Sequence, residues 1–191
     1  MKTKKNFIYN LKEFAIKNDV PIINDEGLAF LLELITKYNV KHILEIGTAI
    51  GYSAINMANL DTKIITVERD YFMYNEALKN IKEANLEENI QVLYADALEV
   101  EINHTFDLIF IDAAKAQYQK FFEKFKFNLN PQGIIVCDNL NFHNLDINEV
   151  SRGTRQLLKK IQKFKDFLKE NEEFETIIYD IGDGISVSKR R

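Results

Sequence analysis

The chain has 191 residues, of which 46% are hydrophobic and 28% charged, and its formal net charge is −4. This composition is typical of a globular protein, so we expect one domain over residues 1–191, with residues 1–40 as a helical extension. No apolar run approaches the roughly 18 to 20 residues that a membrane span requires, and the N-terminus is too polar for a secretory signal. We therefore expect a cytoplasmic protein without a membrane partner.

Charge and cysteine usage narrow the kinds of site that the chain can build. Cys137 is the single cysteine, which excludes a disulfide framework and a thiolate metal cluster and predicts a small core residue. Lysine and arginine gather locally, with five against two acids in residues 1–20 and seven against two in residues 151–170. Such patches can contact RNA phosphates, but a solvated helix face explains them at least as well.

Two helices are predicted at the start of the chain. Residues 4–18 place apolar side chains at helical spacing, namely Phe7, Ile8, Leu11, Phe14 and Ala15. After "VPII", Asn24 predicts the N-cap of a second helix that ends near Tyr38, with Asp25 and Glu26 in its acidic first turn.

Short apolar strands then alternate with helical segments. The strands are predicted at 42–47, 63–68, 90–95, 106–112 and 133–139, and the helices at 51–59, 71–84 and 117–127. Near-continuous apolar strands separated by helices predict a parallel sheet that is covered on both faces. An amphipathic helix follows at about 150–170, and two strand patterns around Asp183-Gly184 predict a hairpin. We expect an α/β fold: a Rossmann-like doubly wound, mostly parallel seven-stranded sheet that ends in an antiparallel hairpin, with N-terminal helices.

The first strand-loop-helix segment, "LEIGTAIGYSA" (44–54), predicts a ligand site, because ligands of such sheets bind beyond the carboxyl ends of the strands. Gly47 and Gly51 allow a sharp turn and a close approach of the backbone, although purely structural glycines are an alternative. Their spacing does not match the dinucleotide fingerprint, which makes an NAD-dependent oxidoreductase a distant candidate.

Three acids lie at the ends of predicted strands. Glu68 follows the glycine loop by about twenty residues, where an acid can accept hydrogen bonds from ribose hydroxyls. Asp96 could meet an adenine amino group or a helix N-terminus, and Glu45 could interact with a ligand ammonium group. Each acid alone is more often structural than functional. Together they favour a nucleoside ligand with a positive centre.

A second group of polar residues follows the next two strands. Asp112 and Lys115 come after "LIFI", and Asp138-Asn139 come after "GIIVC". Neighbouring strand ends can bring two carboxylates and an amide oxygen to one hard cation, for which Mg²⁺ is the best fit and Mn²⁺ or Ca²⁺ are substitutes. The alternatives are a helix cap, a solvated lysine and an ordinary turn.

These segments, in this order from about residue 20 to the end, resemble the class I S-adenosylmethionine-dependent, cation-dependent O-methyltransferases of the caffeoyl-CoA and catechol type. The resemblance implies cofactor contacts by Glu45, Gly47, Tyr52, Ser53, Glu68, Asp96 and the region of Asp112. It also implies catalytic roles for Lys115 and Asp112, with Lys115 beside the transferring oxygen, metal ligation by Asp112, Asp138 and Asn139, and a homodimer.

The acceptor is less well defined by the sequence. Ala114 stands where relatives often carry a further acid, which weakens an assignment to plant phenylpropanoid substrates, and His42, His104 and His143 show no ligand spacing. The layout also resembles the bacterial branch that methylates 5-hydroxyuridine at the tRNA wobble position, so a tRNA anticodon region is the expected partner. Arg152 and Arg155, with Lys159 and Lys163 on the same helix face, would contact it. The alternatives are a small hydroxylated aromatic acceptor of the catechol type and a non-enzymatic RNA- or cofactor-binding module.

Overall fold

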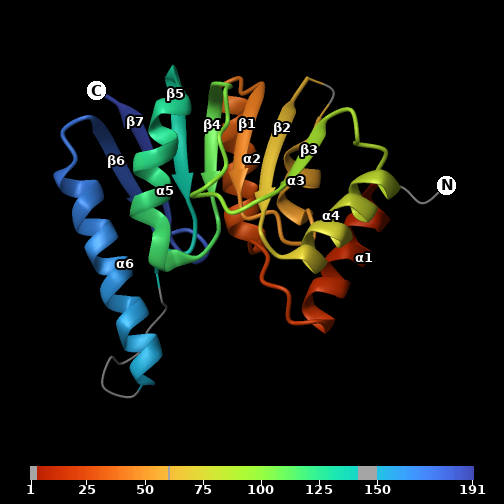
Figure 1. Cartoon of the computed structure of the whole chain (residues 1–191), viewed down its shortest axis with the longest axis horizontal. Helices are drawn as coiled ribbons and strands as arrows, with labels where there is room; N and C mark the ends of the chain where they lie inside the picture. Colours follow the sequence, from red (N-terminus) through yellow and green to blue (C-terminus); the bar gives the residue numbers. More distant parts are fainter. Residues whose placement is uncertain (1–3, 60, 142–149) are drawn as a thin grey trace.

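The structure is a computed structural model that describes residues 4–59, 61–141 and 150–191. A seven-stranded sheet occupies the centre, with helices on both faces (Figure 1). Its strands are β1 (His42–Ile46), β2 (Lys63–Glu68), β3 (Ile90–Tyr94), β4 (Phe106–Ile111), β5 (Leu129–Cys137), β6 (Phe174–Tyr179) and β7 (Ile185–Arg190). The helices are α1 (Lys4–Lys17), α2 (Asp25–Lys37), α3 (Tyr52–Met57), α4 (Tyr71–Glu83), α5 (Tyr118–Phe125) and α6 (Arg152–Glu170), with 3₁₀ turns η1 (Lys115–Gln117) and η2 (Lys126–Asn128).

The strand order is β3-β2-β1-β4-β5-β7-β6, which confirms the predicted doubly wound sheet. β1 pairs in parallel with both β2 and β4, so the order reverses at β1. β5 pairs antiparallel with β7, and β7 with β6, which confirms the terminal hairpin. The reversal at β1 creates the crevice in which ligands of such sheets bind.

Alternating strand residues enter two separate cores, one on each face of the sheet. Ile43, Leu108 and Phe110 pack with residues of α1 to α4, whereas Leu44 and Ile109 pack with residues of α5 and α6. Because successive strand side chains point to opposite faces, a run of apolar residues can supply both cores. This explains why the strands lack an alternating polar pattern.

The element boundaries agree with the sequence except in a few places. β5 begins at Leu129 rather than near residue 133, and its pairing with β4 shifts register between Phe106 and Leu108. The polar residues and the proline in this early part of β5 hide it from a pattern based on apolar runs. In α1, Leu11 and Ala15 are buried as predicted, but Phe14 is exposed.

Asn24 caps α2 as predicted, and its side chain accepts a hydrogen bond from the Gly27 amide. Within the described parts of the chain, every helix is either too short or too polar to cross a bilayer.

Candidate active site

A cavity of about 770 Å³ lies at the carboxyl ends of the parallel strands. Its wall is built from the loops that follow β1, β2, β3, β4 and β5, as the topological rule predicts. Among the residues predicted for the site, those that line it are Gly47, Tyr52, Ser53, Glu68, Asp96, Asp112, Lys115 and Asn139. Residues 20–23, between α1 and α2, and Leu157 of α6 complete the wall.

The loop after β1 depends on Gly47. Its φ angle is 101°, and a Cβ at this position would lie 2.1 Å from the backbone oxygen of Asp112. Neither the conformation nor the space suits another residue. Gly47 therefore allows the backbone after β1 to lie directly against the backbone after β4, and the two loops form one continuous wall. Gly51, with φ of 83°, precedes α3.

Two of the predicted cofactor-binding acids are fixed by backbone amides. Glu68 accepts hydrogen bonds from the amides of Ala49 and Asp70, each at 2.8 Å. Asp96 accepts a hydrogen bond from the Leu98 amide at 2.8 Å, and its other oxygen lies 3.9 Å from the Arg69 guanidinium. Both carboxylates are thus oriented in the wall before a ligand is present.

Glu45 lies behind the wall and does not itself line the cavity. The residue is fully buried, and its carboxylate accepts hydrogen bonds from the hydroxyls of Ser53 and Thr66, each at 2.5 Å. Burial raises the pKa of Glu45 to about 8. Because Ser53 lines the cavity, Glu45 reaches the ligand region through that hydroxyl.

Four of the predicted residues meet in one group, which we call the polar cluster: Asp112, Lys115, Asp138 and Asn139. The Asn139 amide nitrogen donates to the carboxylates of Asp112 at 3.2 Å and Asp138 at 3.1 Å. The Lys115 ammonium donates to the Asn139 side-chain oxygen at 3.1 Å. The residues come from the adjacent ends of β4 and β5, so the predicted juxtaposition is confirmed.

The electrostatics of the polar cluster suit a cation. Burial raises the pKa of Asp112 to about 6, although nearby Lys115 and Asn139 oppose the shift. Burial and the charge of Asp112 raise the pKa of Asp138 to about 7. Oδ1 of Asp138 is buried and has no hydrogen-bond partner in the described part of the chain. Two desolvated carboxylates, one of which has a buried oxygen without a partner in the described part of the chain, are an arrangement that a hard cation stabilises.

The donor set fits Mg²⁺ in type, since it offers carboxylate and amide oxygens. It contains only two acids, and none of the described residues form a group of three or more His, Cys, Asp or Glu side chains that could hold a metal. The Asn139 side chain turns its nitrogen toward the carboxylates, so ligation through its oxygen requires the amide to turn over.

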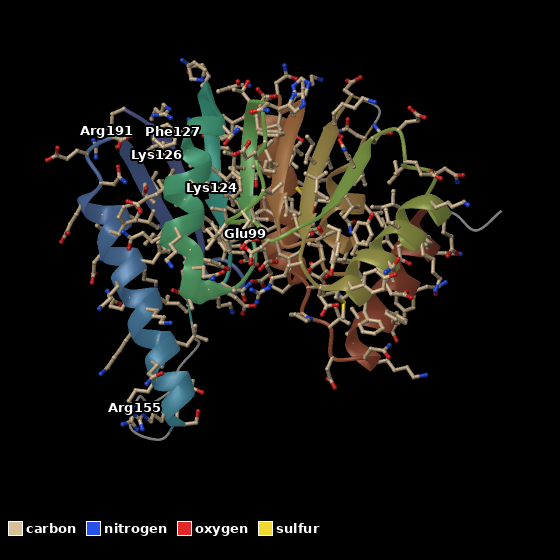
Figure 2. The ribbon with its side chains drawn as sticks, in the orientation of Figure 1. Glu99, Lys124, Lys126, Phe127, Arg155 and Arg191 are labelled. Carbon is tan, nitrogen blue, oxygen red and sulfur yellow. The ribbon has the colours of Figure 1, made fainter. Side chains whose placement is uncertain are left out.

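Helix α6 brings its first turns to the cavity. Leu157 lines the wall, and α6 packs against η1, the turn that begins with Lys115. Arg152 and Arg155 are exposed near the start of this helix. Figure 2 shows Arg155 at the tip of α6, well apart from Lys124 and Lys126. Of the histidines considered, His143 lies outside the described residues.

Four sets of residues at the site were not predicted from the sequence. Thr48 and Thr66 share a buried hydrogen bond behind the wall, Leu157 and residues 20–23 line the cavity, and Tyr118 contacts Asp138. Tyr118 donates a hydrogen bond to the Asp138 carbonyl. Apart from the position of Tyr118 in the "DAAKAQY" segment, no pattern in the sequence distinguishes these residues from ordinary core.

Comparisons with known proteins agree with this geometry. A family model described as O-methyltransferase matches residues 2–191. Tapetum-specific methyltransferase 1 of Arabidopsis thaliana is 31% identical over 95% of this chain and 80% of its own length. The catechol O-methyltransferase of Niastella koreensis is 36% identical over 58% of this chain and 54% of its own length.

A solved structure of a candidate caffeoyl-CoA O-methyltransferase from Staphylococcus aureus superposes with a TM-score of 0.91 and 39% identity. The match covers 96% of this chain and 92% of that protein. The chain therefore belongs to the S-adenosylmethionine-dependent O-methyltransferase family of the caffeoyl-CoA type.

Proposed function

We propose that this enzyme transfers the methyl group of S-adenosylmethionine to an acceptor hydroxyl at the polar cluster, with the help of a divalent cation. The observation that carries the proposal is the cluster of Asp112, Lys115, Asp138 and Asn139, which hydrogen bonds of Asn139 connect and of which all but the fully buried Asp138 line the cavity. A protein that only bound a nucleoside would have no use for two buried, mutually repelling carboxylates beside a lysine.

The cofactor would occupy the part of the cavity between the loops after β1, β2 and β3. Glu68, already held by two backbone amides, would accept hydrogen bonds from the ribose hydroxyls. Gly47 lets the backbone after β1 lie against the backbone after β4 in this wall, and Asp96 lines the wall from the loop after β3. Ser53, backed by Glu45, would orient the amino-acid end of the cofactor.

The cation would be held by Asp112, Asp138 and Asn139, and when bound it favours the ionised form of an acceptor hydroxyl. The chain supplies the rest of the chemistry. Asp112 and Asp138 would offer carboxylate oxygens, and the cavity wall would orient the acceptor oxygen. Lys115 either takes the hydroxyl proton or stabilises the charge that develops on the oxygen.

We propose 5-hydroxyuridine at the tRNA wobble position as the acceptor. Its 5-hydroxyl lies beside the 4-carbonyl, so it presents two adjacent oxygens to one cation. The exposed basic face of α6, with Arg152, Arg155, Lys159 and Lys163, begins next to the cavity wall and could contact phosphates on either side of the base. The proposal rests on this surface and on the resemblance of the layout to the tRNA-modifying branch.

A small catechol-type aromatic is the second candidate. It is favoured by the 36% identity with the catechol O-methyltransferase of Niastella koreensis and by the apolar residues, Val20 to Ile23 and Leu157, in the cavity wall. These residues would contact an aromatic ring on its faces without requiring any phosphate contact.

The two acceptors can be separated with purified enzyme, S-adenosylmethionine and Mg²⁺. Hydroxyuridine-containing tRNA and catechol are offered in parallel, and the methylated products are measured by mass spectrometry. For the tRNA acceptor we expect the Arg152→Ala/Arg155→Ala variant to methylate tRNA more weakly at low salt and to lose activity less steeply with added salt than wild type, while catechol turnover is unchanged. Rapid catechol turnover with no methylation of the tRNA would assign the enzyme to small molecules instead.

A further inference from the structure

Tyr118 contacts the polar cluster from behind. It is the first residue of α5, it is only 1% exposed, and its hydroxyl donates a hydrogen bond of 3.0 Å to the backbone carbonyl of Asp138. Nothing in the proposed chemistry uses this side chain, since it does not line the cavity. Its role must therefore be sought in what the hydrogen bond holds.

The acceptor of this bond belongs to the peptide that joins Asp138 to Asn139, two of the proposed cation ligands. Asn139 has a φ angle of 63°, in the left-handed region that non-glycine residues rarely adopt without support from their surroundings. On the other side, the Asp138 amide donates to the Ile111 carbonyl at 3.2 Å. The Tyr118 hydroxyl is thus a contact from outside the sheet that fixes the orientation of this peptide and of the side chains on either side of it.

The ring of Tyr118 is fixed as well. It packs edge-on against Phe164 of α6 with the ring centroids 5.6 Å apart, and Phe164 is itself 2% exposed. A phenol buried in this way cannot exchange its carbonyl partner for water, because water does not reach it. Its removal would leave the Asp138 carbonyl without this donor.

We propose that Tyr118 is a positioning residue that raises the affinity of the polar cluster for a divalent cation by holding the Asp138–Asn139 peptide. This inference rests on the proposed function. Hydrogen bonds behind metal ligands orient those ligands, and their loss typically lowers metal affinity by about 10- to 100-fold. The Tyr118 hydroxyl lies behind the proposed ligands Asp138 and Asn139, because it donates to the carbonyl of the peptide that joins them.

The test is Mn²⁺ binding to the full chain in the absence of any acceptor, followed by electron paramagnetic resonance or calorimetry. Tyr118→Phe removes only the hydroxyl, and we expect its dissociation constant for Mn²⁺ to rise at least about tenfold. The affinity for S-adenosylmethionine should stay within about twofold of wild type, since the hydroxyl contacts no part of the cofactor wall.

Two control variants separate positioning from loss of packing. Tyr74→Phe removes a hydroxyl from α4, on the cofactor side of the sheet, and should leave Mn²⁺ binding unchanged. Phe164→Leu disturbs the packing around the Tyr118 ring but keeps the hydroxyl, so it should lower Tm while Mn²⁺ affinity stays near wild type.

Two results would overturn the role of Tyr118: wild-type Mn²⁺ affinity in Tyr118→Phe, or an equal loss of affinity in Phe164→Leu and Tyr118→Phe. A wild-type enzyme that bound no Mn²⁺ would instead remove the proposed cation site itself, and the inference would fail with it.

Discussion

At the scale of single residues, the site depends on two carboxylates that are held close together away from water. Asn139 bridges them through its amide nitrogen, and the Asp138 carbonyl and amide are each hydrogen-bonded to a neighbouring element. The carboxylates are therefore placed before any cation binds, which reduces the reorganisation that binding requires. In the cation-free protein, ionised Asp112 and Asp138 repel each other, and this repulsion lowers the free energy of unfolding.

The burial and mutual repulsion of these two carboxylates predict how stability depends on pH when no cation is present. The pKa values of Asp112 and Asp138 are raised to about 6 and about 7, so the folded chain holds their protons more tightly than the unfolded chain does. Their contribution to stability is present at acidic pH and is lost as pH rises from about 4 to about 7. In EDTA, we expect Asp138→Asn to gain Tm relative to wild type between pH 5 and pH 8.

Asp107→Asn is the matched control for this pH series. Backbone and side-chain hydrogen bonds lower the pKa of Asp107 despite its partial burial, so its stabilising effect is complete above pH 4. Measured in a His42→Gln background, which removes the titratable imidazole 3.7 Å from the Asp107 carboxylate, its Tm difference should stay constant between pH 5 and pH 8. A constant difference for Asp138→Asn as well would contradict the raised pKa of Asp138.

Single residues also show how far the sequence could predict the site. Asp112, Asp138 and Asn139 were predicted together because parallel strands end at one edge of a sheet. The cofactor contact of Glu45 stays a prediction, and the sequence did not indicate that the hydroxyls of Ser53 and Thr66 hold this side chain behind the wall. Tyr118 was missed as a support for the site because its carbonyl partner is 20 residues away, and only the folded chain brings them together.

At the scale of elements, α6 connects the acceptor surface to the polar cluster. Its buried residues Ile161, Phe164 and Leu168 pack toward the sheet, and its basic residues stay in solvent, as the amphipathic pattern predicted. Leu157 continues the apolar face toward the start of the helix and enters the cavity wall. The first turns of α6 therefore present both an apolar and a basic surface to the proposed acceptor.

The apolar contribution can be measured with Leu157→Ala. Shortening this side chain should raise the acceptor KM about three- to tenfold through lost apolar contact, while the KM for S-adenosylmethionine is unchanged. Leu158→Ala is the control, since Leu158 is equally half-buried on the same turn but does not line the cavity. Equal effects of the two variants on acceptor KM would indicate loss of helix packing instead of a role in the wall.

The elements themselves were predictable where apolar runs are unbroken. β1 to β4 match the sequence within one residue at each end, because buried parallel strands need side chains that suit two cores. The early part of β5 could not be predicted in this way. There Asn130 and Pro131 interrupt the pattern, and the strand exists because β4 pairs with it across a register shift.

At the scale of the whole molecule, one feature of the sheet topology brings the residues of the site together. The strand order reverses at β1, so the loops after β1 and β4 meet, and Gly47 allows their backbones to touch. The residues predicted to bind the cofactor then fall mainly on the β2–β3 side of this point and the polar cluster on the β5 side. Family membership establishes the enzyme class, whereas the cation, the tRNA acceptor and the homodimer remain proposals.

The most direct test of the central claim is the transfer of labelled methyl groups from S-adenosylmethionine in EDTA and after addition of excess Mg²⁺. We use the acceptor that the wild-type enzyme turns over faster, tRNA or catechol. Wild type should be inactive in EDTA and recover with Mg²⁺, whereas Asp138→Ala should stay at least about 100-fold less active at saturating Mg²⁺. Full wild-type activity in EDTA, or full activity of Asp138→Ala, would contradict a cation-dependent transfer at this site.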